Sequence, residues 1–226
     1  MPVSNSKGRN ANPDPPHHLD LVIDFVNTFD PDTDEDELAT TSGLKNWLTQ
    51  RGLIEQAPPE PREAHRRQAV RLREMLRELM KANNGHEPDP EASRELDRAA
   101  REGRIAIEFG PDGSPRHVPK ADGVAGALAK LLLPVIAADA DGSWGRVKAC
   151  RADDCQWAFY DHSRNRAGVW CDMAVCGNRT KVRAYRSRRP PTPPTPPTPP
   201  TPPTSPTPPT PPTPPTSPTR RGGPDA

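Results

Sequence analysis

Apolar residues in the first two thirds of the chain recur at the three- and four-residue spacing of an amphipathic helix. The first stripe follows residues 19–29, although its β-branched residues are also compatible with a strand. A second stripe has a strongly charged opposite face and predicts a long helix that ends at Asn83-Asn84-Gly85. The apolar positions are Leu19, Val22, Ile23 and Val26 in the first stripe, and Ala69, Leu72, Leu76 and Leu79 in the second.

Shorter elements complete the predicted N-terminal domain. The pattern predicts a short helix that ends at Gly52, a further polar helix, a hairpin that turns at Gly110-Pro111-Asp112-Gly113, and a buried helix bent by Pro134. In chain order they cover residues 44–52, 90–102, 104–118 and 123–138. The sequence thus predicts a mainly helical domain over 19–142, of α+β class, with one small hairpin.

Both ends of the chain differ from this pattern. Residues 1–18 are rich in Asn, Pro and Ser and are expected to be disordered. From Pro190 onward 19 of 37 residues are proline, mostly in a repeating Pro-Pro-Thr triplet, which favours extended polyproline II. Residues 190–226 are therefore interpreted as a disordered tail. It serves either as a spacer or as a docking strip for a protein partner that recognises proline-rich segments.

All four cysteines lie in one short segment, with the spacing Cys150-x4-Cys155-x15-Cys171-x4-Cys176. Four thiolates on two turns supply the soft ligands of a closed, tetrahedral structural zinc site. Disulfides and free thiols are the alternatives. No apolar secretory segment follows Met1, which favours a reducing cytoplasm over disulfide formation. The sequence therefore predicts one structural Zn²⁺ held by these four residues.

The segment around the cysteines, residues 146–189, is too short and too poor in large apolar residues to fold on a core of its own. Zinc binding is expected to supply the missing stability, so that folding and metal binding are one event. A knuckle, a hairpin, and a second knuckle that runs into a helix follow one another in the order of a treble clef. In that helix Val182 and Tyr185 are expected to pack inward against the aromatic residues of the finger.

Charge is distributed unevenly along the chain. Residues 1–145 contain 18 Lys and Arg against 25 Asp and Glu, whereas residues 146–189 contain 11 against 4. Such an excess of cations favours a polyanionic partner, because phosphate binding is driven by the release of counterions. A solvated face, or a dock for an acidic protein, would use the same charges. The expected nucleic-acid contacts are Arg164, Arg166, Asn178, Arg179, Lys181, Arg183, Arg186, Arg188 and Arg189.

Two motifs in the chain resemble known families. The run Cys150-x4-Cys155-Gln156-Trp157-Ala158-Phe159-Tyr160, together with Cys176-Gly177-Asn178-Arg179, resembles the CGNR zinc-finger family of bacterial proteins. The opening segment Leu21-Val22-Ile23-Asp24-Phe25-Val26-Asn27-Thr28 is similar to the ABATE domain that accompanies this finger. The two resemblances cover most of residues 19–189 and imply a stress-related transcription regulator. They imply that the finger binds DNA in the bacterial cytoplasm, in association with the nucleoid.

Three alternatives to a DNA-binding regulator remain open. RNA is the nearest, because aromatic rings of the finger would stack on unpaired bases. A protein-interaction adaptor would dock partners through the zinc module and the tail. An enzyme is disfavoured, because His162 is the one histidine between the knuckles and every other histidine lies upstream. No catalytic residue is therefore assigned.

Two smaller questions concern an effector and a membrane. Asn27 and Thr28 either cap their helix or hydrogen-bond to a neighbouring backbone. Alternatively, Asp24, Asn27 and Thr28 line a pocket for an unidentified small-molecule effector. No apolar run reaches the roughly 20 residues that span a bilayer, so no membrane partner is expected.

Overall fold

A computed structural model describes residues 16–55 and 59–188. The predictions for residues 1–15, for Arg189 and for the proline-rich tail lie outside the described residues. The expected disorder of 1–18 is wrong at its C-terminal end, because the first helix begins at His17. The apolar stripe that starts at Leu19 packs into the core, and this packing orders the turn that precedes it.

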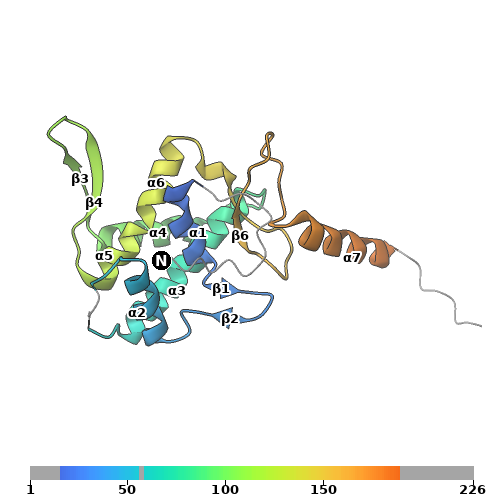
Figure 1. The fold of residues 1–226 in the computed structure, drawn as a ribbon, viewed down its shortest axis with the longest axis horizontal. Helices are drawn as coiled ribbons and strands as arrows, with labels where there is room; N and C mark the ends of the chain where they lie inside the picture. Colours follow the sequence, from blue (N-terminus) through green and yellow to red (C-terminus); the bar gives the residue numbers. More distant parts are fainter. Residues whose placement is uncertain (1–15, 56–58, 189–226) are drawn as a thin grey trace, which may run out of the picture. The chain divides into compact units, whose positions relative to one another are not determined.

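Helices make up most of the described structure (Figure 1). The N-terminal part contains α1 His17–Val26, β1 Phe29–Asp30, β2 Glu35–Asp36, α2 Thr41–Gln50, α3 Glu63–Ala82, α4 Pro90–Glu102, β3 Ile105–Phe109, β4 Pro115–Pro119, α5 Gly123–Lys130 and α6 Leu132–Ala140. The C-terminal part contains the 3₁₀ turn η1 Trp144–Arg146, β5 Val147–Ala149, β6 Ala158–Tyr160, the π-helical turn η2 Met173–Gly177 and α7 Asn178–Arg188.

Local side chains fix several of these helix ends. The hydroxyl of Thr40 accepts a hydrogen bond from the backbone N–H of Gly43 at the start of α2. Asp89 caps α4 in the same way, and Pro90 occupies its first position, where the missing N–H needs no partner. The predicted helix over 123–138 is instead two helices that meet at Leu131. This break places Pro134 in the first turn of α6, where a proline interrupts no helical hydrogen bond.

The strands form three separate antiparallel pairs: β1 with β2, β3 with β4, and β5 with β6. The predicted hairpin over 104–118 is present as β3 and β4, in which Ile107 faces His117. The segment after α1, which is rich in Asp and Glu, contains the small hairpin of β1 and β2. In the third pair Val147 lies opposite Tyr160 and Ala149 opposite Ala158. Cys150 and Cys155 therefore lie in the connection between the two strands of this hairpin.

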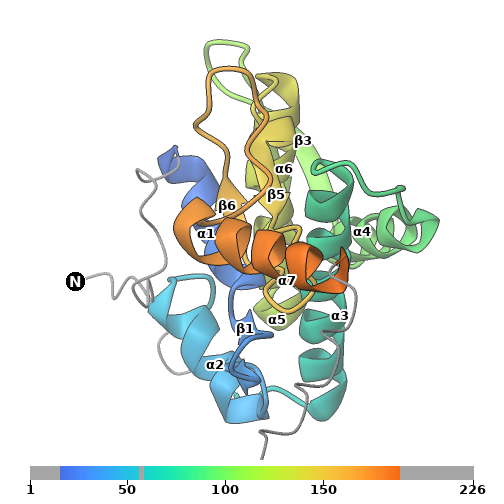
Figure 2. The ribbon, with the colours of Figure 1, turned by 90° about the vertical axis from the view of Figure 1, so that its right-hand side faces the viewer.

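One hydrophobic cluster joins the N-terminal helices to the first strands of the finger. Phe25 of α1, Leu72 of α3 and Leu128 of α5 share it with Val147 and Ala158. Figure 2 shows β5 and β6 beside α1 and α3. The described residues up to Arg188 therefore form one compact unit, in which the segments predicted as two domains, 19–142 and 146–189, share a core.

By length and composition alone, the helical stretch Gly123–Ala140 could cross a membrane. A helix from a protein core passes the same test, and this stretch supplies Leu128, Leu131 and Ala138 to the hydrophobic cluster.

Candidate zinc centre and basic helix

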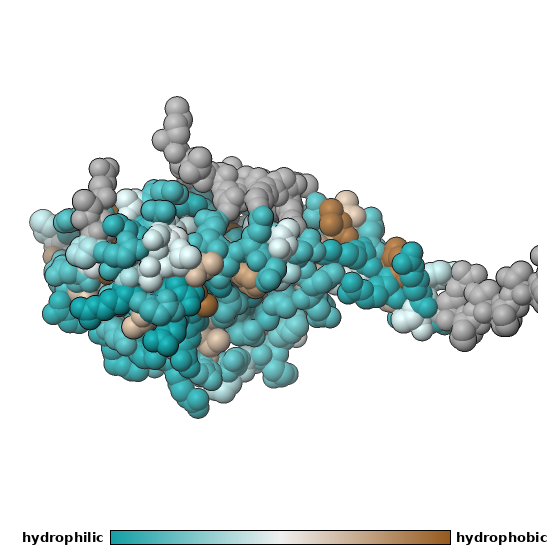
Figure 3. Space-filling view, turned by 90° about the horizontal axis from the view of Figure 1, so that it is seen from below, coloured by the Kyte–Doolittle hydropathy of each residue, from teal (hydrophilic) through white to brown (hydrophobic). Residues whose placement is uncertain are grey.

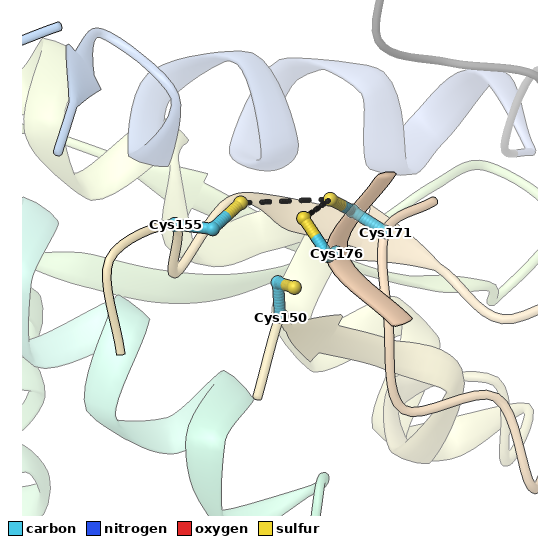
Figure 4. A group of neighbouring side chains, drawn as sticks. All are labelled: Cys150, Cys155, Cys171 and Cys176. Carbon is cyan, nitrogen blue, oxygen red and sulfur yellow. Dashed lines mark hydrogen bonds between the residues drawn. The ribbon is translucent and has the colours of Figure 1, made fainter. Parts of the chain in front are cut away.

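The four cysteines converge from three places in the fold (Figure 4). Cys150 directly follows β5, Cys155 precedes β6, and Cys171 and Cys176 flank the start and the end of the second knuckle. All four are buried, and their sulfur atoms lie within 4.8 Å of one another. The residues predicted as zinc ligands are therefore brought together.

The spacing of the sulfur atoms fits a tetrahedral zinc ion. The Sγ atoms of Cys155 and Cys171 are 3.6 Å apart, and those of Cys171 and Cys176 are 3.7 Å apart. Zinc–sulfur bonds of about 2.3 Å at tetrahedral angles give sulfur–sulfur distances of about 3.8 Å. A disulfide would need about 2.05 Å. The four thiols are unpaired, and their geometry fits a shared metal ion.

The pKa values of the four thiols differ in direction, because without a cation the neighbouring thiols cannot all be thiolates. The pKa of Cys150 is lowered to about 4, first because the thiols of Cys155 and Cys171 donate hydrogen bonds to its sulfur. The pKa values of Cys155 and Cys171 are raised, first because each acts as a donor to Cys150. Burial raises the pKa of Cys176. A divalent cation at the centre would stabilise all four thiolates together.

Backbone hydrogen bonds shape both knuckles. The N–H groups of Cys155 and Gln156 both donate to the carbonyl of Ala152, and Gln156 has a positive φ of 50°. In the second knuckle the carboxylate of Asp172 accepts hydrogen bonds from the N–H groups of Ala174 and Val175. This cap fixes the π-helical turn that carries Cys176.

The helix that follows the second knuckle is strongly basic. α7 carries five cationic residues and no carboxylate, and none of its described residues is buried. Asn178 donates from its amide to the carbonyl of Ala174 and so joins the helix to the knuckle. The five cations are Arg179, Lys181, Arg183, Arg186 and Arg188.

Comparison with known families matches both parts of the chain. The CGNR zinc finger matches residues 146–189. The ABATE family, described as "Putative stress-induced transcription regulator", matches residues 19–141, more than half of the chain. The chain belongs to the ABATE family. No curated protein matches it. Together with the four-cysteine cluster, the two families indicate a zinc-binding regulator.

The ABATE domain holds the first knuckle through buried polar side chains. The Asn27 side chain donates to the carbonyl of Ala158 at 2.9 Å and accepts from its N–H at 2.8 Å, as a neighbouring strand would. The guanidinium of Arg77 donates to the carbonyl of Gln156 and to that of Val26 at the end of α1. Asn84 donates to the carbonyls of Ala149 and Val169. The contacts of Arg77 and Asn84 were not predicted, because the sequence pattern marks burial of apolar residues only.

The side chain of Asn27 thus makes contacts within the fold, and so do the side chains of Asp24 and Thr28, the other residues of the predicted effector pocket. Asp24 pairs with Arg51 at 2.5 Å. The hydroxyl of Thr28 donates to the carbonyl of Phe25 and accepts from a buried guanidinium of α3. The hydrogen bonds of Asn27 and Thr28 to backbone carbonyls correspond to the backbone-bonding alternative, whereas Asp24 forms a side-chain ion pair. The existence of an effector pocket stays a prediction.

A buried ion pair organises the loop between the knuckles of the CGNR finger. Lys148 lies 2.7 Å from Asp161 and also donates to the carbonyls of Arg166 and Gly168. Asp161 accepts further hydrogen bonds from the N–H groups of Ser163 and Gly168. Burial works to raise the pKa of Asp161, but the hydrogen bonds from Lys148 and Ser163 outweigh it and lower the pKa. The pair presents Arg166 and its neighbour Arg164 on the surface.

The predicted nucleic-acid residues of α7 fall into two groups. Arg179 pairs with Asp32 of the ABATE domain at 3.1 Å and lies 3.6 Å from Asp154, while its Nη2 is 3.7 Å from the sulfur of Cys176. Arg183 pairs with the same Asp154 at 3.0 Å. Among the described residues no carboxylate pairs with the three other cations of the helix, Lys181, Arg186 and Arg188.

The aromatic packing of the finger differs from the expectation. Trp157 and Phe159 are buried around the cysteines, with Trp170 packed against them. Val182 and Tyr185, expected to join them, are 48% and 66% exposed. The cysteines, Trp157 and Phe159 fill the interior of the finger, so that the apolar residues of α7 stay at the surface. The exposed His162 lies with its ring edge against Tyr160.

Proposed function

We propose that this protein is a cytoplasmic, zinc-dependent transcription regulator that binds duplex DNA through α7 and the loop between the knuckles. The observation on which this proposal depends is the composition of α7, an 11-residue helix with five cations, no carboxylate and no buried residue. A helix this short is marginal in water on propensity alone, and self-repulsion of its charges weakens it further. Phosphates would neutralise that repulsion and release counterions.

Duplex DNA fits the surface better than single-stranded RNA. Binding of unpaired bases relies on exposed aromatic rings. Of the aromatic residues in the finger, Trp157 and Phe159 are buried and Trp170 packs against them, whereas Tyr185 of α7 is exposed. An α-helix, in contrast, fits the major groove of B-DNA, which is about 12 Å wide. The role is one of binding, and we assign no catalytic residue.

Binding of the zinc-loaded full-length chain to a random-sequence duplex, at several salt concentrations, tests the proposal. The exposed cations Lys181, Arg186 and Arg188, with Arg164 and Arg166 of the loop, predict a log–log salt slope of about −4.5 for five phosphate contacts. Binding that is absent, or that does not change with salt, would contradict the proposal. A single-stranded RNA that competes better than the duplex would favour the RNA alternative.

A further inference from the structure

The two sides of α7 are in different surroundings. On one side, Asp154 forms an ion pair with Arg183 and lies 3.6 Å from Arg179. Asp32 forms a second ion pair with Arg179. Thr180 and Ala184, on the same side of the helix, are partly buried. This inner side is electrically balanced by the protein's own carboxylates, which would repel an approaching phosphate.

The opposite side is cationic and carries apolar groups in the open. Successive residues of an α-helix are rotated by about 100°, which places Tyr185 near the centre of this outer side. Lys181 and Arg188 flank it on one edge and Val182 on the other, and Arg186 lies beyond Val182, at the border with Arg179. Tyr185 is 66% exposed and Val182 48% exposed. Figure 3 shows brown, hydrophobic side chains among the teal surface over this part of the molecule.

An occupant of this surface must match both its charges and its small apolar centre. Three cations around two uncharged side chains match a polyanion that also offers flat or methyl-bearing groups between its charges. The major groove of duplex DNA has this arrangement, with phosphates along both edges and base edges, including thymine methyl groups, on its floor. An 11-residue helix is about 16 Å long, which suits insertion across the groove. A membrane-surface helix, in contrast, needs a broad apolar face.

We propose that the outer side of α7 reads bases in the major groove: Tyr185 and Val182 contact base edges, while Lys181, Arg186 and Arg188 contact phosphates. Arg179 and Arg183 are internal ties that hold the helix to the finger and to the ABATE domain. This assignment rests on the proposed binding of duplex DNA. It makes Tyr185 and Val182 the residues that determine sequence specificity.

A matched pair of substitutions tests the assignment of the two sides. Arg188→Ala and Arg183→Ala make the same chemical change on the same helix, on the outer and the inner side. With the zinc-loaded full chain and a random-sequence duplex, Arg188→Ala should reduce the steepness of the log–log salt slope by about 0.9, for one lost phosphate contact. Arg183→Ala should leave the slope unchanged. Equal changes in both variants, or a larger change for Arg183→Ala, would overturn the assignment.

Selection from a randomised duplex library tests the reading of bases. The wild type should enrich a sequence motif, and the Val182→Ala/Tyr185→Ala variant should keep the salt slope but lose enrichment at one or more positions, with about a tenfold lower preference for the motif. The same motif and preference in both proteins would overturn the base contacts. Salt-dependent binding without any motif would overturn them too, while the proposed function stands.

A different result is expected if the protein does not bind duplex DNA at all. A wild type that binds no duplex, but binds vesicles of phosphatidylserine in a manner lost with Tyr185→Ala, would assign the surface to an anionic membrane and overturn both proposals. The zinc content and circular dichroism of each variant serve as folding controls. Both should match the wild type, because the substituted side chains are exposed.

Discussion

Asn27→Ala removes the side chain that joins α1 to the β6 strand of the finger. The Asn27 amide makes hydrogen bonds to both backbone groups of Ala158, which is fully buried. Alanine can make neither, and no water can reach Ala158 without opening the core. The substitution therefore leaves one N–H and one C=O unpaired at the junction between the helices and the zinc centre.

The expected cost follows from these two groups. A buried polar group without a partner costs about 1–3 kcal/mol, so the pair should lower the free energy of unfolding by about 2–6 kcal/mol. For a folded unit of this size each kcal/mol shifts the melting temperature by about 2–4 °C. A loss of about 4 kcal/mol, the middle of this range, corresponds to a decrease of about 8–16 °C. Because β6 begins three residues after Cys155, zinc should also dissociate faster.

Thermal unfolding followed by circular dichroism, together with zinc release to a chromophoric chelator, measures both effects. Asn46→Ala is the matched control, because Asn46 is exposed on α2 and its loss should change stability by less than about 0.5 kcal/mol. Asn27→Asp should fall between, since a carboxylate still accepts from the N–H but repels the carbonyl. If Asn27→Ala melts within about 1 °C of the control, the junction does not stabilise the protein as argued.

Three further predictions concern the zinc centre and its supports. Cys171→Ser should reduce bound zinc, measured by mass spectrometry, below one ion per chain and lower the melting temperature of the whole described unit; an unchanged melting curve would contradict the shared core. Arg179→Ala should speed zinc transfer to a chelator about tenfold, because the guanidinium no longer lies beside the thiolate of Cys176, with Arg179→Lys intermediate; equal rates would refute that role. The pKa of Asp161 is lowered in the folded state, so its contribution is present above its unfolded pKa of about 3.9 and is lost as pH falls through the folded pKa. The stability difference between wild type and Asp161→Asn in urea should therefore shrink below about pH 4, and a difference that persists or grows would count against the Lys148 pair.

Much of the framework followed from local patterns. The stripes of α1 and α3 predicted two helices because an amphipathic helix needs only its own periodicity to be recognised. The cysteine spacing predicted the metal ligands because four soft donors in one short segment have few other uses. The break at Leu131 was missed, since an apolar helix with one proline gives no sign of where its hydrogen bonds change partner.

The fate of individual polar residues could not be predicted in the same way. Lys148 lies in a short strand where a lysine usually points to solvent, yet it is buried against Asp161. Arg183 was grouped with the other cations of its helix, because the sequence does not say that Asp154 lies beside it. Such pairings depend on residues that meet only in the folded chain.

By itself, the sequence determined that this chain has a helical N-terminal domain and four cysteines fit to hold zinc, because periodicity and ligand chemistry are local properties. Only the tertiary structure decided that the finger shares a core with the helices and that α7 has a balanced inner side and a cationic outer side. The physical reason is that burial and charge pairing are set by distances between segments far apart in the chain, as when Asn27 meets Ala158.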